Sequence, residues 1–178
     1  MLTGLWDAKM DRAPVLALTG QVQVQVFGPG AFQDIPLKEA FDAVSRFGQT
    51  VLHSSRHAEL MSLACKTAIV ERDVAHLVFP DDVTKMESDA PAAAAIGRLG
   101  RTDVAPSAES LSEMAKMVAG AERPLIVVGY GARHAMDQII ALAETLGCPV
   151  ATTFKAKGQI PDTHPLAAGV LGRSGTPV

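Results

Sequence analysis

Two segments in the C-terminal third of the chain combine glycine with cationic or hydroxyl side chains. The first, Gly129-Tyr130-Gly131, follows an apolar run at 125–128 and precedes an amphipathic helical pattern. Glycine lets the backbone approach a ligand closely, and the N-terminal N–H groups of a helix attract anions. We therefore expect a strand, a glycine turn and a helix that hold a nucleotide's phosphates. Arg133 would lie in the first helical turn, where a bound anion would offset its unfavourable interaction with the helix dipole.

The second segment follows the next predicted strand and runs from Thr152 to Gly158. It offers hydroxyl groups, ammonium groups and a glycine at the carboxyl end of a strand, the edge where α/β sheets bind ligands. These groups suit a pyrophosphate. A polar exit loop without a ligand remains an equally good interpretation. The candidate residues are Thr152, Thr153, Lys155, Lys157 and Gly158.

The glycine motif is only a partial dinucleotide fingerprint. The full pattern needs a small residue where His134 stands, and no Asp or Glu ends the next strand. An ordinary tight turn and a solvated Arg133 therefore remain open. On spacing alone, Gly28 to Asp34, which contains Phe32 and Gln33, is likewise just a loop after a strand.

Other polar residues are better explained by structure than by chemistry. His53 and His57 straddle a predicted strand-to-helix turn, so we predict no metal site there. Asp81-Asp82 follows a strand and a proline, a position typical of a turn cap. His76 is expected inside a buried strand, and His164 in a turn. No Ser/His/Asp or Cys/His arrangement can be assembled.

The elements that must position these segments alternate between strand and helix. The first block predicts strands at 14–20, 49–54 and 74–79 and helices at 37–48 and 57–72. Nearly continuous apolar strands that alternate with helices indicate an α/β fold with a parallel sheet covered on both faces. In the second helix, the predicted inward residues are Leu60, Leu63, Ala64, Thr67 and Ala68.

A change of composition divides the chain. Residues 86–107 are rich in Ala, Pro and Gly and predict a linker between an α/β block at 1–85 and another at 108–178. The second block begins with a helix at 109–121, and its last residues, 169–178, predict a glycine-rich loop. We expect two parallel-sheet segments, both incomplete.

Composition excludes several classes of function. The net charge is −3 with scattered Lys and Arg, and aromatic residues make up 4%, so nucleic acid is not the expected partner. No run approaches the roughly 18 apolar residues of a membrane span, and charges interrupt the N-terminal apolar segment, which argues against a secretory signal. Cys65 and Cys148 form no CxxC motif. Buried free thiols in a cytoplasmic protein are expected.

Taken together, these segments resemble the thiamine-diphosphate-dependent pyruvate oxidase and acetolactate synthase family. The first block is similar to the second half of the pyrimidine-binding domain, through LTGLWDAKMDRAPVLALTGQV, GAFQDI and VFPDDV. The second block is similar to the start of the family's middle domain, a Rossmann-like (DHS-like NAD/FAD-binding) domain. It matches through RPLIVVGYGARHA and LAETLGCPVATTFKAKGQIPDTHPLAAGVLG. GYGARHA with TTFKAKG looks closest to the pyruvate oxidase branch, where the equivalent loops hold FAD.

The resemblance implies a homo-oligomeric parent that decarboxylates a 2-oxo acid such as pyruvate, with thiamine diphosphate and Mg²⁺ as cofactors. It gives Phe32 and Gln33 an accessory role beside the active site. The residues that it implies for nucleotide binding are Gly129, Gly131, Arg133, Thr152, Thr153, Lys155, Lys157, Gly158, Gly172 and Arg173.

The sequence also departs from the family pattern. It contains no Gly-Asp-Gly and no asparagine, so the motif that holds Mg²⁺ and the diphosphate is missing, and it begins after the region of the activating glutamate. We expect this chain to be part of such an enzyme and, alone, catalytically silent. The alternatives are a non-catalytic module that binds FAD or ADP, and a purely structural scaffold.

Overall fold

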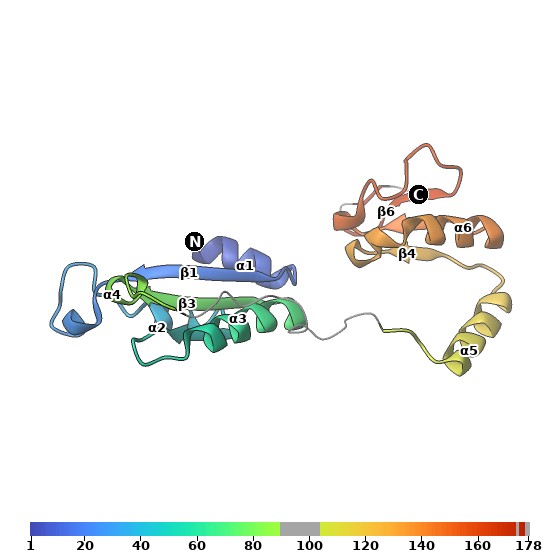
Figure 1. Ribbon diagram of the computed structural model, residues 1–178. Helices are drawn as coiled ribbons and strands as arrows, with labels where there is room; N and C mark the ends of the chain where they lie inside the picture. Colours follow the sequence, from blue (N-terminus) through green and yellow to red (C-terminus); the bar gives the residue numbers. More distant parts are fainter. Residues whose placement is uncertain (90–103, 174, 177–178) are drawn as a thin grey trace. The chain divides into compact units, whose positions relative to one another are not determined.

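The computed structural model describes residues 1–89, 104–173 and 175–176. The chain divides into two compact units, Met1–Val104 (unit 1) and Ala105–Val178 (unit 2), which we describe separately (Figure 1). The boundary falls within the predicted linker 86–107, most of which lies outside the described residues.

Unit 1 is built on a three-stranded parallel sheet, sheet A, with the order β1-β3-β2. Its strands are β1 (Val15–Gln21), β2 (Phe47–Thr50) and β3 (Val74–Pro80). The central strand β3 is buried at every position except Phe79, which is half-buried. A central strand is covered on both faces, which is why its sequence is apolar apart from His76.

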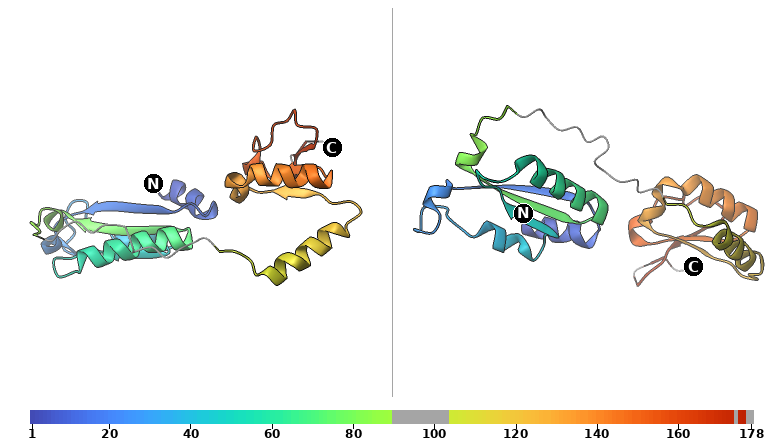
Figure 2. Two further views of the ribbon diagram at one scale, coloured as in Figure 1. Left: turned by 45° about the vertical axis from the view of Figure 1, so that its right-hand side comes forward. Right: turned by 60° about the horizontal axis from the view of Figure 1, so that its bottom comes forward.

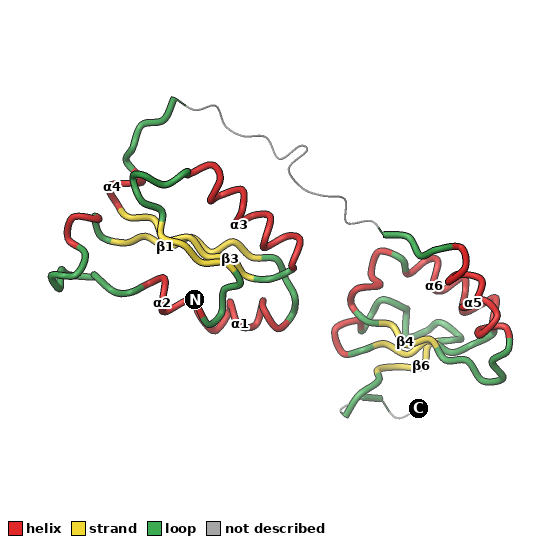
Figure 3. Tube along the Cα trace, turned by 90° about the horizontal axis from the view of Figure 1, so that it is seen from below, coloured by secondary structure: helices red, strands yellow, loops and turns green. Residues whose placement is uncertain are grey.

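Helices cover both faces of sheet A (Figure 3). On one face lie α1 (Leu2–Met10) and α2 (Leu37–Asp42), and on the other lies α3 (His57–Glu71), while the short α4 (Asp81–Thr84) follows β3 directly. Alternate β3 residues point to opposite faces. One cluster joins Leu5, Ala17, Phe41, Val44 and Val74, and the other joins Val51, Ala64, Ala68, Ala75, Leu77 and Val83.

Unit 2 contains a second parallel sheet, sheet B, with the order β4-β5-β6. Its strands are β4 (Ile126–Val128), β5 (Val150–Thr152) and β6 (Ala167–Val170). One face packs against α6 (Met136–Leu146), around Val128, Met136, Ala143 and Val150 (Figures 1 and 2). The helix α5 (Ala108–Ala119) precedes the sheet, with the Ser107 hydroxyl accepting a hydrogen bond from the Ser110 N–H at its start.

The predicted alternation of strands and helices is confirmed, and the differences have local causes. The helix predicted at 37–48 ends at Asp42, because the Arg46 N–H donates to the Val74 carbonyl (2.7 Å) and draws the chain into sheet A. β2 therefore occupies 47–50 rather than 49–54. In α3, Ala64 and Ala68 are buried as predicted, whereas Leu63 is 46% exposed.

Several elements were not predicted. α1 lies in the N-terminal segment, α4 begins at Asp81, where the sequence predicts a turn cap, and β6 includes Gly169 and Val170, which the sequence predicts as loop. Ala-Ala-Gly-Val has weak strand propensity, so its pairing with β5 rather than its own preference makes it a strand. Cys148 is buried, whereas Cys65 is only half-buried. No helix within the described residues is long and apolar enough to span a membrane.

Candidate functional site

The carboxyl edge of sheet B brings the two predicted phosphate-binding segments together. β4 and β5 are parallel neighbours, and the Thr153 N–H donates to the Val128 carbonyl at 2.8 Å. The 3-10 helix Tyr130–His134 (η2) leaves β4, and the 3-10 helix Phe154–Ala156 (η3) leaves β5. The two 3-10 helices contact each other. The segments therefore share one rim of the sheet.

A third loop reaches the same rim. The Leu171 N–H donates to the Thr152 carbonyl at 2.8 Å, just beyond the end of β6. Gly172 and Arg173 follow directly, and Arg173 is exposed. All three strands of sheet B thus deliver their exit loops to one edge, where an anionic ligand could contact each of them.

The first two glycines leave open space at this rim. Within the described part of the chain, a Cβ added to Gly129 or Gly131 would meet no heavy atom within 4 Å. Neither residue has a positive φ, so the backbone conformation does not demand glycine either. Gly158 differs, because its φ of +84° lies in the region that favours glycine. The bare backbone at 129 and 131 is therefore free for the close approach of a ligand.

The structure corrects the predicted surroundings of Arg133. The α-helix does not begin at the glycine turn: η2 intervenes, and α6 begins at Met136. Arg133 therefore lies in η2 and not in the first turn of the α-helix. Its guanidinium carbon lies 4.5 Å from the centre of the Tyr130 ring, and Nη1 donates to the Tyr130 carbonyl at 3.3 Å. The residue is held in place without a ligand.

The remaining candidates in unit 2 differ in how accessible they are. Thr152 is buried, and its hydroxyl donates to the Gly169 carbonyl at 3.4 Å, which links β5 to β6. Thr153 is half-buried, whereas Lys155 and Lys157 are exposed on the β5 exit loop. The two lysines are thus exposed to solvent at this rim, whereas the Thr152 hydroxyl forms a hydrogen bond within sheet B.

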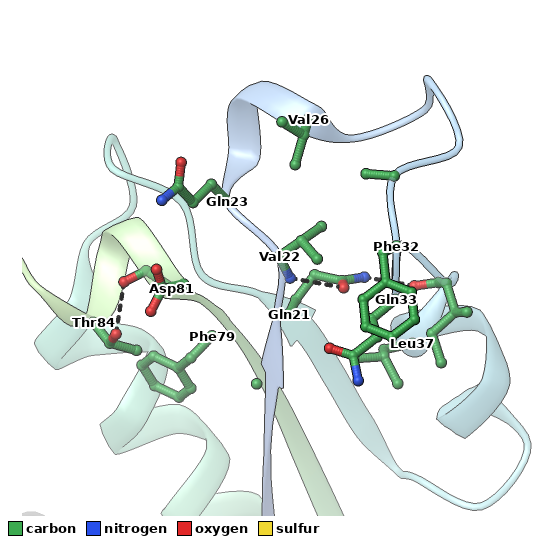
Figure 4. A pocket seen from close by; sticks show the side chains of 13 residues that line it. Gln21, Val22, Gln23, Val26, Phe32, Gln33, Leu37, Phe79, Asp81 and Thr84 are labelled. Carbon is green, nitrogen blue, oxygen red and sulfur yellow. Dashed lines mark hydrogen bonds between the residues drawn. The ribbon is translucent and has the colours of Figure 1, made fainter.

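The carboxyl edge of sheet A carries a separate cavity of about 820 Å³ that contains Phe32 and Gln33 (Figure 4). Phe32 is 88% exposed. Among the described residues that line the cavity, none is Lys or Arg. Its polar side chains are Gln21, Gln23, Gln33, Asp81 and Thr84. The Lys85 ammonium hydrogen-bonded to Asp81 holds the pKa of that carboxyl below its usual range.

Sequence reasoning missed Gln21, which anchors the loop that carries Phe32 and Gln33. Its Oε1 accepts from the Val22 N–H at 2.9 Å, and its Nε2 donates to the Ile35 carbonyl at 2.5 Å. One side chain therefore joins the two ends of the loop. The available clue was position, since Gln21 is the last residue of a parallel strand, where α/β folds place functional side chains.

The histidines have separate partners. His53 Nε2 lies 3.2 Å from Asp82 Oδ2, whereas His57 Nε2 donates to the Leu52 carbonyl at 2.8 Å. His76 is fully buried in β3, and His164 Nδ1 accepts from the Leu166 N–H at 3.2 Å. Within the described ranges, no three His, Cys, Asp or Glu side chains form a group that could hold a metal ion.

Comparison with known proteins identifies the architecture of unit 2. Residues 111–178 match the family model "Thiamine pyrophosphate enzyme, central domain". Most of unit 2 is thus similar to the central domain of thiamine pyrophosphate enzymes. The matched residues include all of sheet B, so the rim described above lies within the matched segment.

Longer similarities cover almost the whole chain. It is 34% identical over 178 residues to the putative thiamine pyrophosphate-containing protein YdaP of Bacillus subtilis, covering 99% of this chain and 31% of that protein. A probable acetolactate synthase large subunit of Methanocaldococcus jannaschii is 32% identical, with 99% and 31% covered. Pyruvate oxidase of Lactiplantibacillus plantarum is 28% identical, with 97% and 29% covered. The chain thus spans about a third of the length of these relatives.

Proposed function

We propose that the protein is part of a thiamine-diphosphate-dependent enzyme that acts on a 2-oxo acid, and that unit 2 binds an adenine nucleotide, FAD or ADP. The similarity to acetolactate synthases and to a pyruvate oxidase supports the first part. The observation that carries the second part is the hydrogen bond from the Thr153 N–H to the Val128 carbonyl. It joins the glycine-containing loop to the lysine-containing loop at one rim.

The residues at this rim fit a diphosphate. Gly129 and Gly131 leave open backbone, while Lys155, Lys157 and Arg173 supply exposed positive charge. Pyrophosphates are bound by close backbone approach together with such cations. A bound FAD would supply an isoalloxazine ring that can accept electrons. We assign these residues, with Arg133, Thr152, Thr153, Gly158 and Gly172, to the nucleotide site.

For unit 1 we propose an accessory role. It would be the C-terminal half of a pyrimidine-binding domain, with Phe32 and Gln33 bordering the active site. The sequence contains no Gly-Asp-Gly and no asparagine, so its residues do not provide the family's Mg²⁺-diphosphate motif. We therefore expect no turnover when this polypeptide is mixed with pyruvate, thiamine diphosphate and Mg²⁺. Release of CO₂ above a protein-free control would contradict this expectation.

Nucleotide binding is tested by calorimetric titration of the whole chain with FAD and with ADP. The Gly131→Ala variant should fold with unchanged or slightly higher stability, because its φ is compatible with alanine. The new methyl group should nevertheless lower nucleotide affinity about tenfold by occupying the ligand's space, a cost of about 1.4 kcal/mol. Gly4→Ala, in α1 of unit 1, is the matched control and should not change affinity. Equal affinity for all three proteins would refute the site.

A structural scaffold is the second candidate, and the state of Arg133 favours it. The guanidinium already contacts the Tyr130 ring and carbonyl, so its presence needs no ligand. The Arg133→Ala variant separates the two functions. Loss of nucleotide affinity with an unchanged melting temperature supports the nucleotide site. A lower melting temperature of unit 2, with no nucleotide binding by either protein, supports the scaffold.

A further inference from the structure

We propose that Asp82 is a positioning residue that sets the width of the cavity beside Phe32 and Gln33. It does so by holding together the segments that follow all three strands of sheet A. This inference rests on the proposed accessory role of Phe32 and Gln33, and it concerns unit 1 alone.

The carboxylate of Asp82 has two distant partners. Asp82 belongs to α4, which follows β3. Its Oδ1 accepts from the N–H of Val24, at 3.1 Å, in the 3-10 helix Val24–Val26 (η1) that follows β1. Its Oδ2 lies 3.2 Å from Nε2 of His53, in the segment after β2. One side chain therefore bridges three exit segments, each from a different strand.

The bond to Val24 connects two walls of the cavity. One wall contains Gln23 and Val26, on either side of Val24, and the other contains Asp81 and Thr84 of α4 (Figure 4). Loss of this bond would leave the two walls joined by the side chains of Asp81 and Gln23 but without a tie to the backbone of η1. The distance between these walls is therefore controlled by a residue whose own side chain does not line the cavity.

The loop that carries Phe32 depends on such anchors. Phe32 is 88% exposed, so burial does little to fix its position. The loop is closed internally, where the Gly28 N–H donates to Asp34 Oδ2 at 2.7 Å, and at its base, where Gln21 binds the Ile35 carbonyl. The Asp82–Val24 bond holds the first part of the loop, η1, which follows β1. Without this bond, the closed loop could swing as a unit about its base.

The neighbouring aspartate has different partners. The Asp81 carboxylate pairs with Lys85 at 2.6 Å and also interacts with the Gln23 side chain, and its carbonyl accepts from the Thr84 hydroxyl. Asp81 is also more exposed, at 45% against 26% for the Asp82 side chain. Asp81→Asn therefore removes an equivalent negative charge from the first turn of α4, while it keeps the carboxylate of Asp82 that accepts from the Val24 N–H.

Amide hydrogen exchange followed by NMR on the full chain tests the proposal. Removing a hydrogen bond to a charged acceptor should accelerate exchange of the Val24 amide at least tenfold in Asp82→Ala. The amide resonances of Phe32 and Gln33 should shift in the same variant. Asp82→Asn keeps an oxygen acceptor and should restore Val24 protection to within a few-fold of the wild type. Asp81→Asn should leave Val24 protection unchanged.

A separate variant isolates the second contact. His53→Ala should accelerate exchange only in residues 52–55 and should leave the Val24 amide protected, because that bond uses the other carboxylate oxygen. Val24 protection that is unchanged in Asp82→Ala would overturn the proposal. So would an equal acceleration in Asp81→Asn.

If Asp82→Ala does not fold, the Asp82→Asn variant becomes the test of the proposal. In Asp82→Asn the proposal then requires that the Val24 amide stays protected and that the amides of residues 52–55 exchange faster than in the wild type. Unchanged exchange at 52–55 contradicts the proposal. All of these amides belong to unit 1, so the result does not depend on whether unit 2 binds a nucleotide.

Discussion

The two sheets have the same plan, but their carboxyl edges are organised differently. In unit 1 the exit loops are tied by side chains, from Gln21 to Ile35 and from Asp82 to Val24, around a cavity lined by glutamines and phenylalanines. In unit 2 the ties described are backbone hydrogen bonds, from Thr153 to Val128 and from Leu171 to Thr152; unit 1 has one bond of this kind as well, from Val51 to Val78.

The two edges also differ in charge. Lys157 and Arg173 are exposed at the rim of sheet B, where they can meet an anion. At the edge of sheet A the side chains of Gln21 and Asp82 tie the loops, and Asp81 is the only charged group among the described lining residues. A three-stranded parallel sheet can thus present either an anion-binding rim or a largely neutral cavity, according to what holds its loops.

The largest expected effect comes from destabilising unit 1, which tests whether ADP binding by unit 2 is independent of unit 1. Leu77 is fully buried at the centre of sheet A, so Leu77→Ala should destabilise unit 1 by about 2–5 kcal/mol. Trp6, the only tryptophan, lies in unit 1 and reports its urea unfolding by fluorescence. The affinity of unit 2 for ADP should not change. Leu63→Ala, at a 46% exposed position of α3, should cost less than half as much. A parallel loss of ADP affinity would mean that the units are coupled.

A smaller expected effect is the loss of stability of unit 1 at acidic pH. His76 is fully buried, its Nδ1 has no hydrogen-bond partner within the described residues, and Nε2 lies 2.9 Å from the Thr19 hydroxyl. Burial lowers the pKa of His76; among nearby charges, Asp42 opposes this effect and Lys38 reinforces it. An unfolded histidine titrates near pH ~6.5. Below that pH the unfolded chain binds more protons than the folded one, until the folded pKa is also passed.

Unit 1 should therefore lose stability as the pH falls below about 6.5, by at most about 1.4 kcal/mol per pH unit from this group. Urea unfolding followed through Trp6 at several pH values measures the slope. His76→Gln removes the titrating group and should flatten the profile between pH ~6.5 and 5. Identical slopes for the two proteins would show that acid acts elsewhere.

The smallest effect tests the charge at the rim of sheet B. Lys157→Gln should weaken ADP binding several-fold at low salt, since a single exposed cation near a phosphate contributes modestly and is screened by salt. The difference from wild type should shrink as salt is added. Lys66→Gln makes the same charge change at an exposed position of α3 in unit 1 and should not change ADP affinity. A salt-independent loss would indicate a structural role for Lys157.

The sequence predicts the elements whose residues carry their own periodicity. Strand β3 and helix α3 are within one residue of the predicted ranges, because a central strand is nearly all apolar and a long helix has a regular pattern. β6 and the early end of α2 were missed, since pairing with neighbouring strands decides both. Such pairing involves residues distant in sequence.

The candidate site shows the same division. Because the segments after β4 and β5 follow parallel strands, the sequence suffices to bring Gly129 and Thr153 to one edge. It does not reveal that Arg133 stacks on Tyr130 in a 3-10 helix, or that Gln21 and Asp82 hold the loops of unit 1. These contacts depend on the rotamers of single side chains and on partners up to 58 residues away.

The nucleotide site at sheet B is tested most directly by the change in backbone amide resonances when ADP is added to the labelled protein. If ADP binds there, the shifts should be concentrated at residues 129–134, 152–158 and 172–173, and the resonances of 20–37 and 79–85 should not move. Shifts centred on the cavity of unit 1, or no shifts at millimolar ADP, would contradict the assignment of the nucleotide site to sheet B.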